Sequence, residues 1–121
     1  MENLQAATEA TIQHHLESFG NRDIKETMKD YAEDSEVWTP DGVITGLNAI
    51  ASFFSDLFTL LPKESTQFES RQQIIKDSKV YLVWAAESAK VNIPFGTDSF
   101  EIKNGKIVWQ SLALQMTLKA E

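Results

Sequence analysis

Up to Pro62, apolar positions recur every three or four residues, apart from one short extended segment. After Pro62 they recur at every second residue. Residues 4–19 predict an amphipathic helix, which Gly20-Asn21 ends. Asp23 followed by Glu26 has the spacing of a capping box and predicts a second, shorter helix. The apolar face of the first helix comprises Leu4, Thr8, Ile12, His15, Leu16 and Phe19, and that of the second Ile24, Met28 and Tyr31.

A short extended hairpin precedes the third helix. Residues 36–39 are extended, Pro40-Asp41-Gly42 is a turn signal, and Val43-Ile44 is the predicted return strand. Gly46 then leads into the third helix, which Pro62 ends. Its broad apolar face contains Ile50, Phe53, Phe54, Leu57, Phe58 and Leu61.

Strands are predicted for the rest of the chain, at about 66–75, 79–91, 93–103 and 106–118. The links between them include Asn104-Gly105, a strong hairpin signal. Helices followed by meandering strands predict an α+β fold, in which three N-terminal helices cover one face of an antiparallel sheet.

The segment from Val80 to Ala86 is apolar on both faces, whereas a sheet with one wet face should alternate. We therefore expect this strand to be central, with a second copy of the chain covering the outer sheet face. Leu82, Trp84 and Trp109 are the predicted contacts of this homodimer. The alternatives are a terminal segment that folds over this strand and a thick core within one chain.

The composition bounds the function. A length of 121 residues fits one domain, 1–121, and 42% hydrophobic residues is close to the globular average. No apolar stretch approaches the ~20 residues that span a bilayer, and no secretory signal is visible. A net charge of −7 with scattered basic residues disfavours nucleic acids and anionic membranes as partners. Without cysteine there is no disulfide or thiolate site, and the cytoplasm is the expected compartment.

Four strings, in this order and spacing, carry a family resemblance: GNRDI (20–24), YAEDSEV (31–37), GLNAI (46–50) and DSFEIKNGKI (98–107). They resemble the SnoaL-like branch of the nuclear-transport-factor-2-like superfamily. The resemblance covers nearly the whole chain and implies a cystatin-like cone with an apolar cavity at one end, and homodimers formed through the outer sheet face. The superfamily includes ketosteroid isomerases, polyketide cyclases, dehydratases, epoxide hydrolases and proteins without catalytic activity, so the fold alone does not assign a reaction.

Asp98 is the first candidate catalytic residue. It leaves the same strand face as Phe100 and Ile102, and a carboxylate on an apolar face must be paired, hydrogen-bonded or protonated. Burial would raise its pKa and keep a neutral acid that donates a hydrogen bond. The alternative is a carboxylate in water at a strand end. By the resemblance, Asp98 aligns with the oxyanion-hole aspartic acid of ketosteroid isomerases.

His15 is the second candidate. It lies on the apolar face of the first helix, where a lone histidine is more often a core residue than a catalytic one. The resemblance places it where the isomerases carry their oxyanion-hole tyrosine, so that His15 and Asp98 would both donate to a developing enolate oxygen. His14 leaves that face and is expected in solvent, and an adjacent histidine pair lacks the spacing of helical metal ligands, so no metal is expected.

The general base is the point of departure from the family. The base position of the isomerases falls at Thr39, and threonine cannot remove a carbon-bound proton at neutral pH. The candidate replacements are Glu87 and a water molecule. Glu87 shares strand parity with Tyr81 and Val83, and the resemblance turns that face toward the cavity.

Two functions follow from these residues. The first is a cofactor-independent isomerase, cyclase or dehydratase that acts by acid–base chemistry on a small apolar carbonyl compound. The second is a dimeric module that binds such a molecule without converting it. For either, an apolar, oxygen-bearing ligand would be contacted by a predicted pocket wall. The predicted wall residues are Tyr31, Trp38, Thr39, Phe54, Phe58, Gln110 and Met116.

Overall fold

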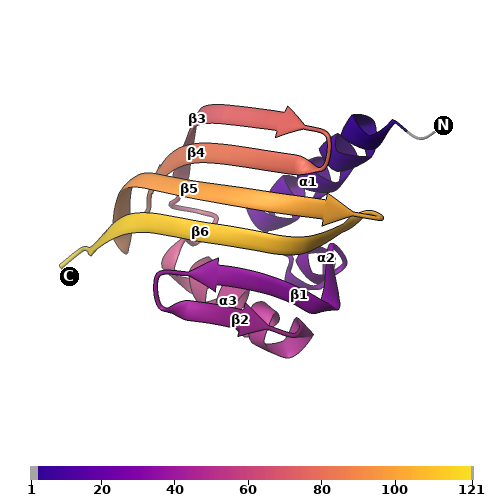
Figure 1. The fold of residues 1–121 in the computed structure, drawn as a ribbon. Coiled ribbons are helices and arrows are strands. Elements are labelled where there is room, and N and C mark those ends of the chain that lie inside the picture. Colours follow the sequence, from indigo (N-terminus) through magenta and orange to yellow (C-terminus); the bar gives the residue numbers. More distant parts are fainter. Residues whose placement is uncertain (1–2, 121) are drawn as a thin grey trace.

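The computed structural model describes residues 3–120, in which a six-stranded sheet carries its helices on one face (Figure 1). The predicted α+β class is confirmed, with helices in the N-terminal half and long strands after them. No helix within these residues is long and apolar enough to cross a bilayer. The elements are α1 (Leu4–Gly20), α2 (Ile24–Met28), β1 (Tyr31–Thr39), β2 (Gly42–Thr45), α3 (Leu47–Leu60), β3 (Gln67–Lys76), β4 (Lys79–Glu87), β5 (Val91–Lys103) and β6 (Lys106–Leu118).

The strands lie in the order β2-β1-β6-β5-β4-β3. All neighbouring pairs are antiparallel except β1 and β6, which run parallel. The sheet is otherwise antiparallel, as predicted. No tight turn joins β1 and β6, so their relative direction is free. Register shifts mark bulges that add a residue in β3, β5 and β6, and such bulges increase the local bend and twist of the sheet.

The helix starts follow the predicted capping. Asp23 accepts a hydrogen bond from the Glu26 backbone N–H at 3.1 Å and begins α2. The prediction that Tyr31 belongs to this helix is wrong, since α2 ends at Met28 and Tyr31 is the first residue of β1. The cause is tertiary: the Asp30 carbonyl accepts from the backbone N–H of Ile107 at 2.7 Å, which draws the chain into pairing with β6.

The core lies between the helices and the inner face of the sheet. Ile12 of α1 and Phe54 of α3 are 2% exposed, and they meet Val37 of β1 and Phe100 of β5. Burying such side chains contributes about 1.5–3 kcal/mol each, so these four anchor both helices to the sheet.

The connection between β4 and β5 is a three-residue loop that the sequence pattern did not reveal. The predicted strand 79–91 ends at Glu87, and the Ser88 hydroxyl organises the turn. It accepts hydrogen bonds from the Lys90 and Val91 backbone N–H groups and donates to the Leu60 carbonyl at 2.8 Å. The loop therefore ties the end of α3 to the sheet.

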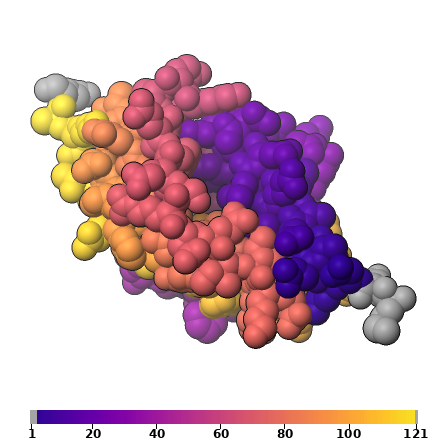
Figure 2. Space-filling model, turned by 90° about the horizontal axis from the view of Figure 1, so that it is seen from above, coloured from indigo at the N-terminus to yellow at the C-terminus, as the bar shows by residue number. Residues whose placement is uncertain are grey.

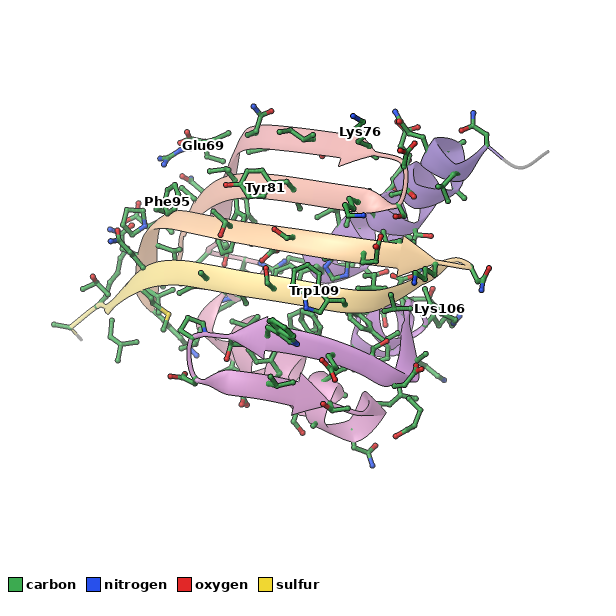
Figure 3. All side chains as sticks on the ribbon, in the orientation of Figure 1. Glu69, Lys76, Tyr81, Phe95, Lys106 and Trp109 are labelled. Carbon is green, nitrogen blue, oxygen red and sulfur yellow. The ribbon has the colours of Figure 1, made fainter. Side chains whose placement is uncertain are left out.

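Leu82 and Trp84 lie on the helix side of the sheet, so their prediction as outer-face dimer contacts is wrong. Successive strand residues alternate in direction, and Tyr81 is 40% exposed whereas Leu82 is 7% exposed. Tyr81 and Trp109 lie on the outer face, opposite the helices (Figure 3). Of the three predicted contacts, only Trp109 keeps its place there.

Candidate functional site

A pocket of about 280 Å³ lies between α1, α3 and the inner face of β3–β6. Figure 2 shows a hollow on this side of the molecule, between the indigo α1 and the rose-coloured β3. Its wall is mostly apolar and aromatic, as expected of a small-molecule site. The residues that line it include His15, Phe19, Phe54, Leu57, Phe68, Leu82, Trp84, Asp98, Gln110, Leu112 and Leu114.

His15 reaches the pocket from the buried face of α1 and is 3% exposed. Its ring packs edge-on against Tyr31, Phe54 and Phe100, with centroid distances of 6.0, 5.8 and 5.5 Å. Burial, with a smaller effect of the neighbouring His14 charge, lowers its pKa to about 4. At neutral pH the imidazole is therefore uncharged, and its buried Nδ1 has no hydrogen-bond partner.

Asp98 enters the pocket from the inner face of β5. Its cross-strand neighbours are apolar on both sides, Leu82 on β4 and Leu112 on β6. Desolvation raises its pKa to about 7, so the carboxyl group exchanges its proton near neutral pH. Its Oδ1 atom is buried and has no hydrogen-bond partner.

Gln110 and Tyr31 form a fixed polar pair behind these groups. Gln110 lines the pocket from β6 and is 1% exposed, and its Oε1 accepts a short hydrogen bond from the Tyr31 hydroxyl. Burial, followed by the nearby charges of Asp98 and Asp30, raises the pKa of Tyr31 well above 10. The phenol therefore stays protonated, and its one proton is committed to Gln110 rather than to a ligand.

Trp84 is the pocket residue that the sequence placed on the wrong face. Its indole lies over Gly96 of β5, where a Cβ atom would stand 2.7 Å from the ring carbons Cε2 and Cζ2. The indole Nε1 is buried without a partner. Among residues 3–120, three of the five buried side-chain polar atoms that lack a hydrogen bond therefore belong to residues that line this pocket.

Glu87 does not face the cavity, so its predicted position is wrong. Its carboxylate is 60% exposed and pairs with Lys119 Nζ at 2.8 Å. The parity of the prediction holds, because Glu87 leaves the same exposed face of β4 as Tyr81. Both faces of this strand are apolar in the sequence, so the pattern did not show which of them the helices cover.

Thr39 and Trp38 also lie away from the pocket. Thr39 closes the β1–β2 turn, where its hydroxyl donates to the Gly42 carbonyl and accepts from the Asp41 backbone N–H, both at 3.1 Å. Trp38 is 48% exposed on the outer face, with its ring 5.7 Å from that of Trp109. Neither side chain can contact a ligand in the cavity.

Phe58 and Met116 are not among the residues lining the pocket. The Phe58 ring packs against Phe19 at 5.1 Å and supports the wall from behind. Met116 is 42% exposed near the end of β6. The structure thus brings His15, Phe54, Asp98 and Gln110 together and leaves the other predicted wall and base residues outside.

The inward position of Trp84 could have been found by counting strand register. Asp98 was expected to face inward, and its cross-strand partner Leu82 must then face inward too, as must Trp84 two residues on. The count requires the length of the β4–β5 loop, which the sequence pattern did not show.

The comparisons with known proteins agree with this architecture. The family model described as a SnoaL-like domain matches residues 12–110. No curated protein matches the sequence.

Three solved structures illustrate the fold. A putative ketosteroid isomerase from Kribbella flavida has 14% identity and a TM-score of 0.74, covering 96% of this chain and 83% of its own. An NTF2-like protein of unknown function from Mesorhizobium loti has 17% identity and a TM-score of 0.76, with 95% and 96% covered. TerC, co-crystallised with polyporic acid, has 17% identity and a TM-score of 0.72, with 90% and 92% covered. At these identities the likeness concerns the fold alone.

Proposed function

Because this chain belongs to the SnoaL-like family, we propose that it is an acid–base enzyme of the isomerase, cyclase or dehydratase kind, acting without a cofactor on a small apolar carbonyl compound. The observation that carries the proposal is an apolar pocket in which His15 Nδ1 and Asp98 Oδ1 are buried without partners. An unpaired buried polar atom costs about 1–3 kcal/mol, and folded proteins keep few of them. A ligand carbonyl group in the pocket would give the His15 N–H an acceptor and would bring the adjacent C–H bond to Asp98.

Asp98 is the proton carrier in this proposal, in place of Glu87. A general acid or base works best when its pKa lies near the working pH, and that of Asp98 is about 7. As a carboxylate it would take a proton from the carbon next to a carbonyl group, and the electron pair of that C–H bond would move to the carbonyl oxygen. The neutral imidazole of His15 would donate a hydrogen bond to the resulting enolate. In a substrate whose enolate is conjugated with a C=C bond, the electron pair would return from the oxygen through that bond, and the far carbon would take the proton back from Asp98.

The second candidate is a binding module that holds the same kind of molecule without converting it. Two observations favour it. The family base position is occupied by Thr39, whose hydroxyl is engaged in a turn. Glu69, the other acidic residue that lines the pocket, pairs with Arg71 at 2.9 Å. The TerC structure also supports a small-molecule site in this fold.

For both candidates we retain the cytoplasm as the expected compartment, because a chain without cysteine suits a reducing environment.

Hydrogen–deuterium exchange of an enolisable probe separates the two candidates. We expect the protein to accelerate exchange of the α-protons of 2-tetralone in D₂O, followed by NMR, with a midpoint near pH 7 set by Asp98. Asp98→Asn should reduce this rate by about 100-fold or more, the usual contribution of a general base. Asp41→Asn, in the exposed β1–β2 turn, is the matched control and should keep the full rate.

Two outcomes contradict the enzyme proposal. Exchange that survives Asp98→Asn would remove the proton carrier. Binding of 2-tetralone without any accelerated exchange would select the binding module instead.

We also propose that two copies of the chain associate through the outer sheet face. A groove of about 550 Å³ crosses this face, with Trp38 and Trp109 on one side and Tyr81 on the other. The large apolar residues of the face are about half exposed, and such patches mark interaction sites. One row crosses all six strands in register and has serines at its centre: Val43, Trp38, Ser111, Ser99, Tyr81 and Ile74.

Sedimentation tests this dimer. The wild type should sediment at twice the chain mass of 13.6 kDa. Ser111→Arg would place a charge at the centre of the row and should yield monomers. Ser52→Arg, exposed on α3, should stay dimeric. A monomeric wild type would contradict the proposal.

A further inference from the structure

We propose that the Trp84 indole N–H is a second ligand-binding donor in the pocket, and that the ligand is a flat apolar molecule with oxygens at two opposite ends. This inference rests on the proposed function of the pocket and specifies the ligand class. One oxygen would lie between His15 and Asp98, and the other against Trp84.

The position of the indole is built into the sheet. Trp84 and Gly96 are direct cross-strand partners on β4 and β5, and the ring lies across the glycine. The ring carbon nearest to a Cβ at Gly96, at 2.7 Å, is Cε2, to which Nε1 is bonded. The Phe68 ring of β3 packs edge-on from the other side, with a centroid distance of 6.1 Å. Any side chain at position 96 would push the indole away, so Gly96 is a positioning residue.

The indole N–H has no acceptor in the protein. Nε1 of Trp84 is buried and unpaired, and an indole nitrogen can only donate. The contrast with Trp38 is direct, since its N–H donates to Glu36 at 2.8 Å although that side chain is half exposed. A buried donor without a partner is costly, and a ligand oxygen in the pocket is the acceptor that would satisfy it.

The strand geometry sets the spacing of the two oxygens. Gly96 and Asp98 are two residues apart on the inner face of β5, and their pairing with Trp84 and Leu82 is regular. Two residues along a strand correspond to about 7 Å. Between the two polar ends the pocket wall is apolar, with Leu112 and Leu114 of β6 beneath. Two fused six-membered rings with oxygens at opposite ends match this arrangement.

Two matched probes test the inference, namely 2-naphthol with one hydroxyl group and 2,6-dihydroxynaphthalene with two. Calorimetric titration of the wild type should show tighter binding of the diol by roughly fivefold, the effect of one net hydrogen bond. Trp84→Phe and Gly96→Ala should bring this ratio to about one while 2-naphthol affinity changes by less than about twofold, because only the second contact is lost. Trp38→Phe, which removes an indole of the outer face, is the matched control and should keep the preference.

Each outcome has a distinct meaning. Binding of both probes with a preference for the diol that survives Trp84→Phe would overturn the role of the indole and leave the pocket function intact. No binding of either probe to the wild type at millimolar concentration would overturn both. A ¹⁵N-labelled protein provides an independent readout, since the Trp84 Nε1–H resonance should shift with the diol and stay in place with 2-naphthol. This measurement on the wild type decides the question even if Gly96→Ala does not fold.

Discussion

Two adjacent histidines of α1, His14 and His15, point to different sides of the helix and have different surroundings. His14 faces a polar cluster in which its Nδ1 lies 2.7 Å from Asp30 Oδ2 and its Nε2 lies 3.1 Å from Glu26 Oε1. The hydrogen bond with Asp30, and then that with Glu26, raises the pKa of His14 above its ordinary value of 6.5. The expectation that His14 is simply solvated is therefore wrong. It links α1, α2 and the residue before β1.

On the other side of the helix, His15 shares a pocket with Asp98, and neither has a protein partner for its buried atom. The pKa values of the two histidines move in opposite directions, since that of His15 falls through burial, whereas burial raises the pKa of both carboxyl groups, Asp98 and Asp30. The same two residue types thus form a satisfied ion pair in one place and an unsatisfied neutral pair in the other. The first arrangement stabilises the fold, whereas the second costs stability and suits a ligand.

The largest expected effect concerns Asp98. Its folded-state pKa of about 7 exceeds the ordinary 3.8, so the folded state holds the proton more tightly and stability falls as pH rises from about 4 to 7. Asp98→Asn removes this penalty and should raise the free energy of unfolding at pH 8 by roughly 2–4 kcal/mol, since one pKa unit corresponds to about 1.4 kcal/mol. Urea titrations from pH 4 to 9 measure it. A destabilised variant at pH 8 would refute the account of this carboxyl group.

The matched substitution beside His14, Asp30→Asn, should change the free energy of unfolding in the opposite direction. Asp30→Asn removes the main partner of protonated His14 and should lower the free energy of unfolding by about 1–3 kcal/mol at pH 6. The raised pKa of His14 gives stability that is present below 6.5 and is lost as pH rises through the folded value. The cost of the substitution should therefore be smaller at pH 9, in the same urea series. A cost that grows with pH would contradict the ion pair.

The smallest effect distinguishes the two histidines directly. The lowered pKa of His15 means that the unfolded state takes up a proton first, so acid destabilises the protein through this residue. His15→Gln should remove about 1 kcal/mol of the stability lost between pH 6.5 and 5.5. His14→Gln should instead steepen the loss, because it deletes a group that binds a proton in the folded state. If the stability of both variants depended equally on pH, the proposed difference between His14 and His15 would be contradicted.

The sequence was informative where local spacing decides the direction of a side chain. The helical period predicted that His15 points inward, and the strand period predicted the same for Asp98. Both residues line the pocket. Phe54 and Gln110 follow from the same two periods. The α+β order follows from the change of period at Pro62, whereas the pocket was implied by the family resemblance.

The misplaced residues depend on features that a period does not encode. The strand β4 is apolar on both faces, so its period did not show which face meets the helices, and the opposite choice misplaced both Trp84 and Glu87. Tyr31 left its predicted helix because the preceding Asp30 carbonyl bonds to Ile107, 77 residues later in the chain. Such long-range pairing cannot be read from neighbouring residues.

The most direct test of the account is an NMR titration of both histidine rings and the Asp98 carboxyl group. We predict midpoints of about 4 for His15 and about 7 for Asp98, with His14 above 6.5. Midpoints at the ordinary values of 6.5 for His15 and 3.8 for Asp98 would show two solvated, incidental polar residues and would contradict the site.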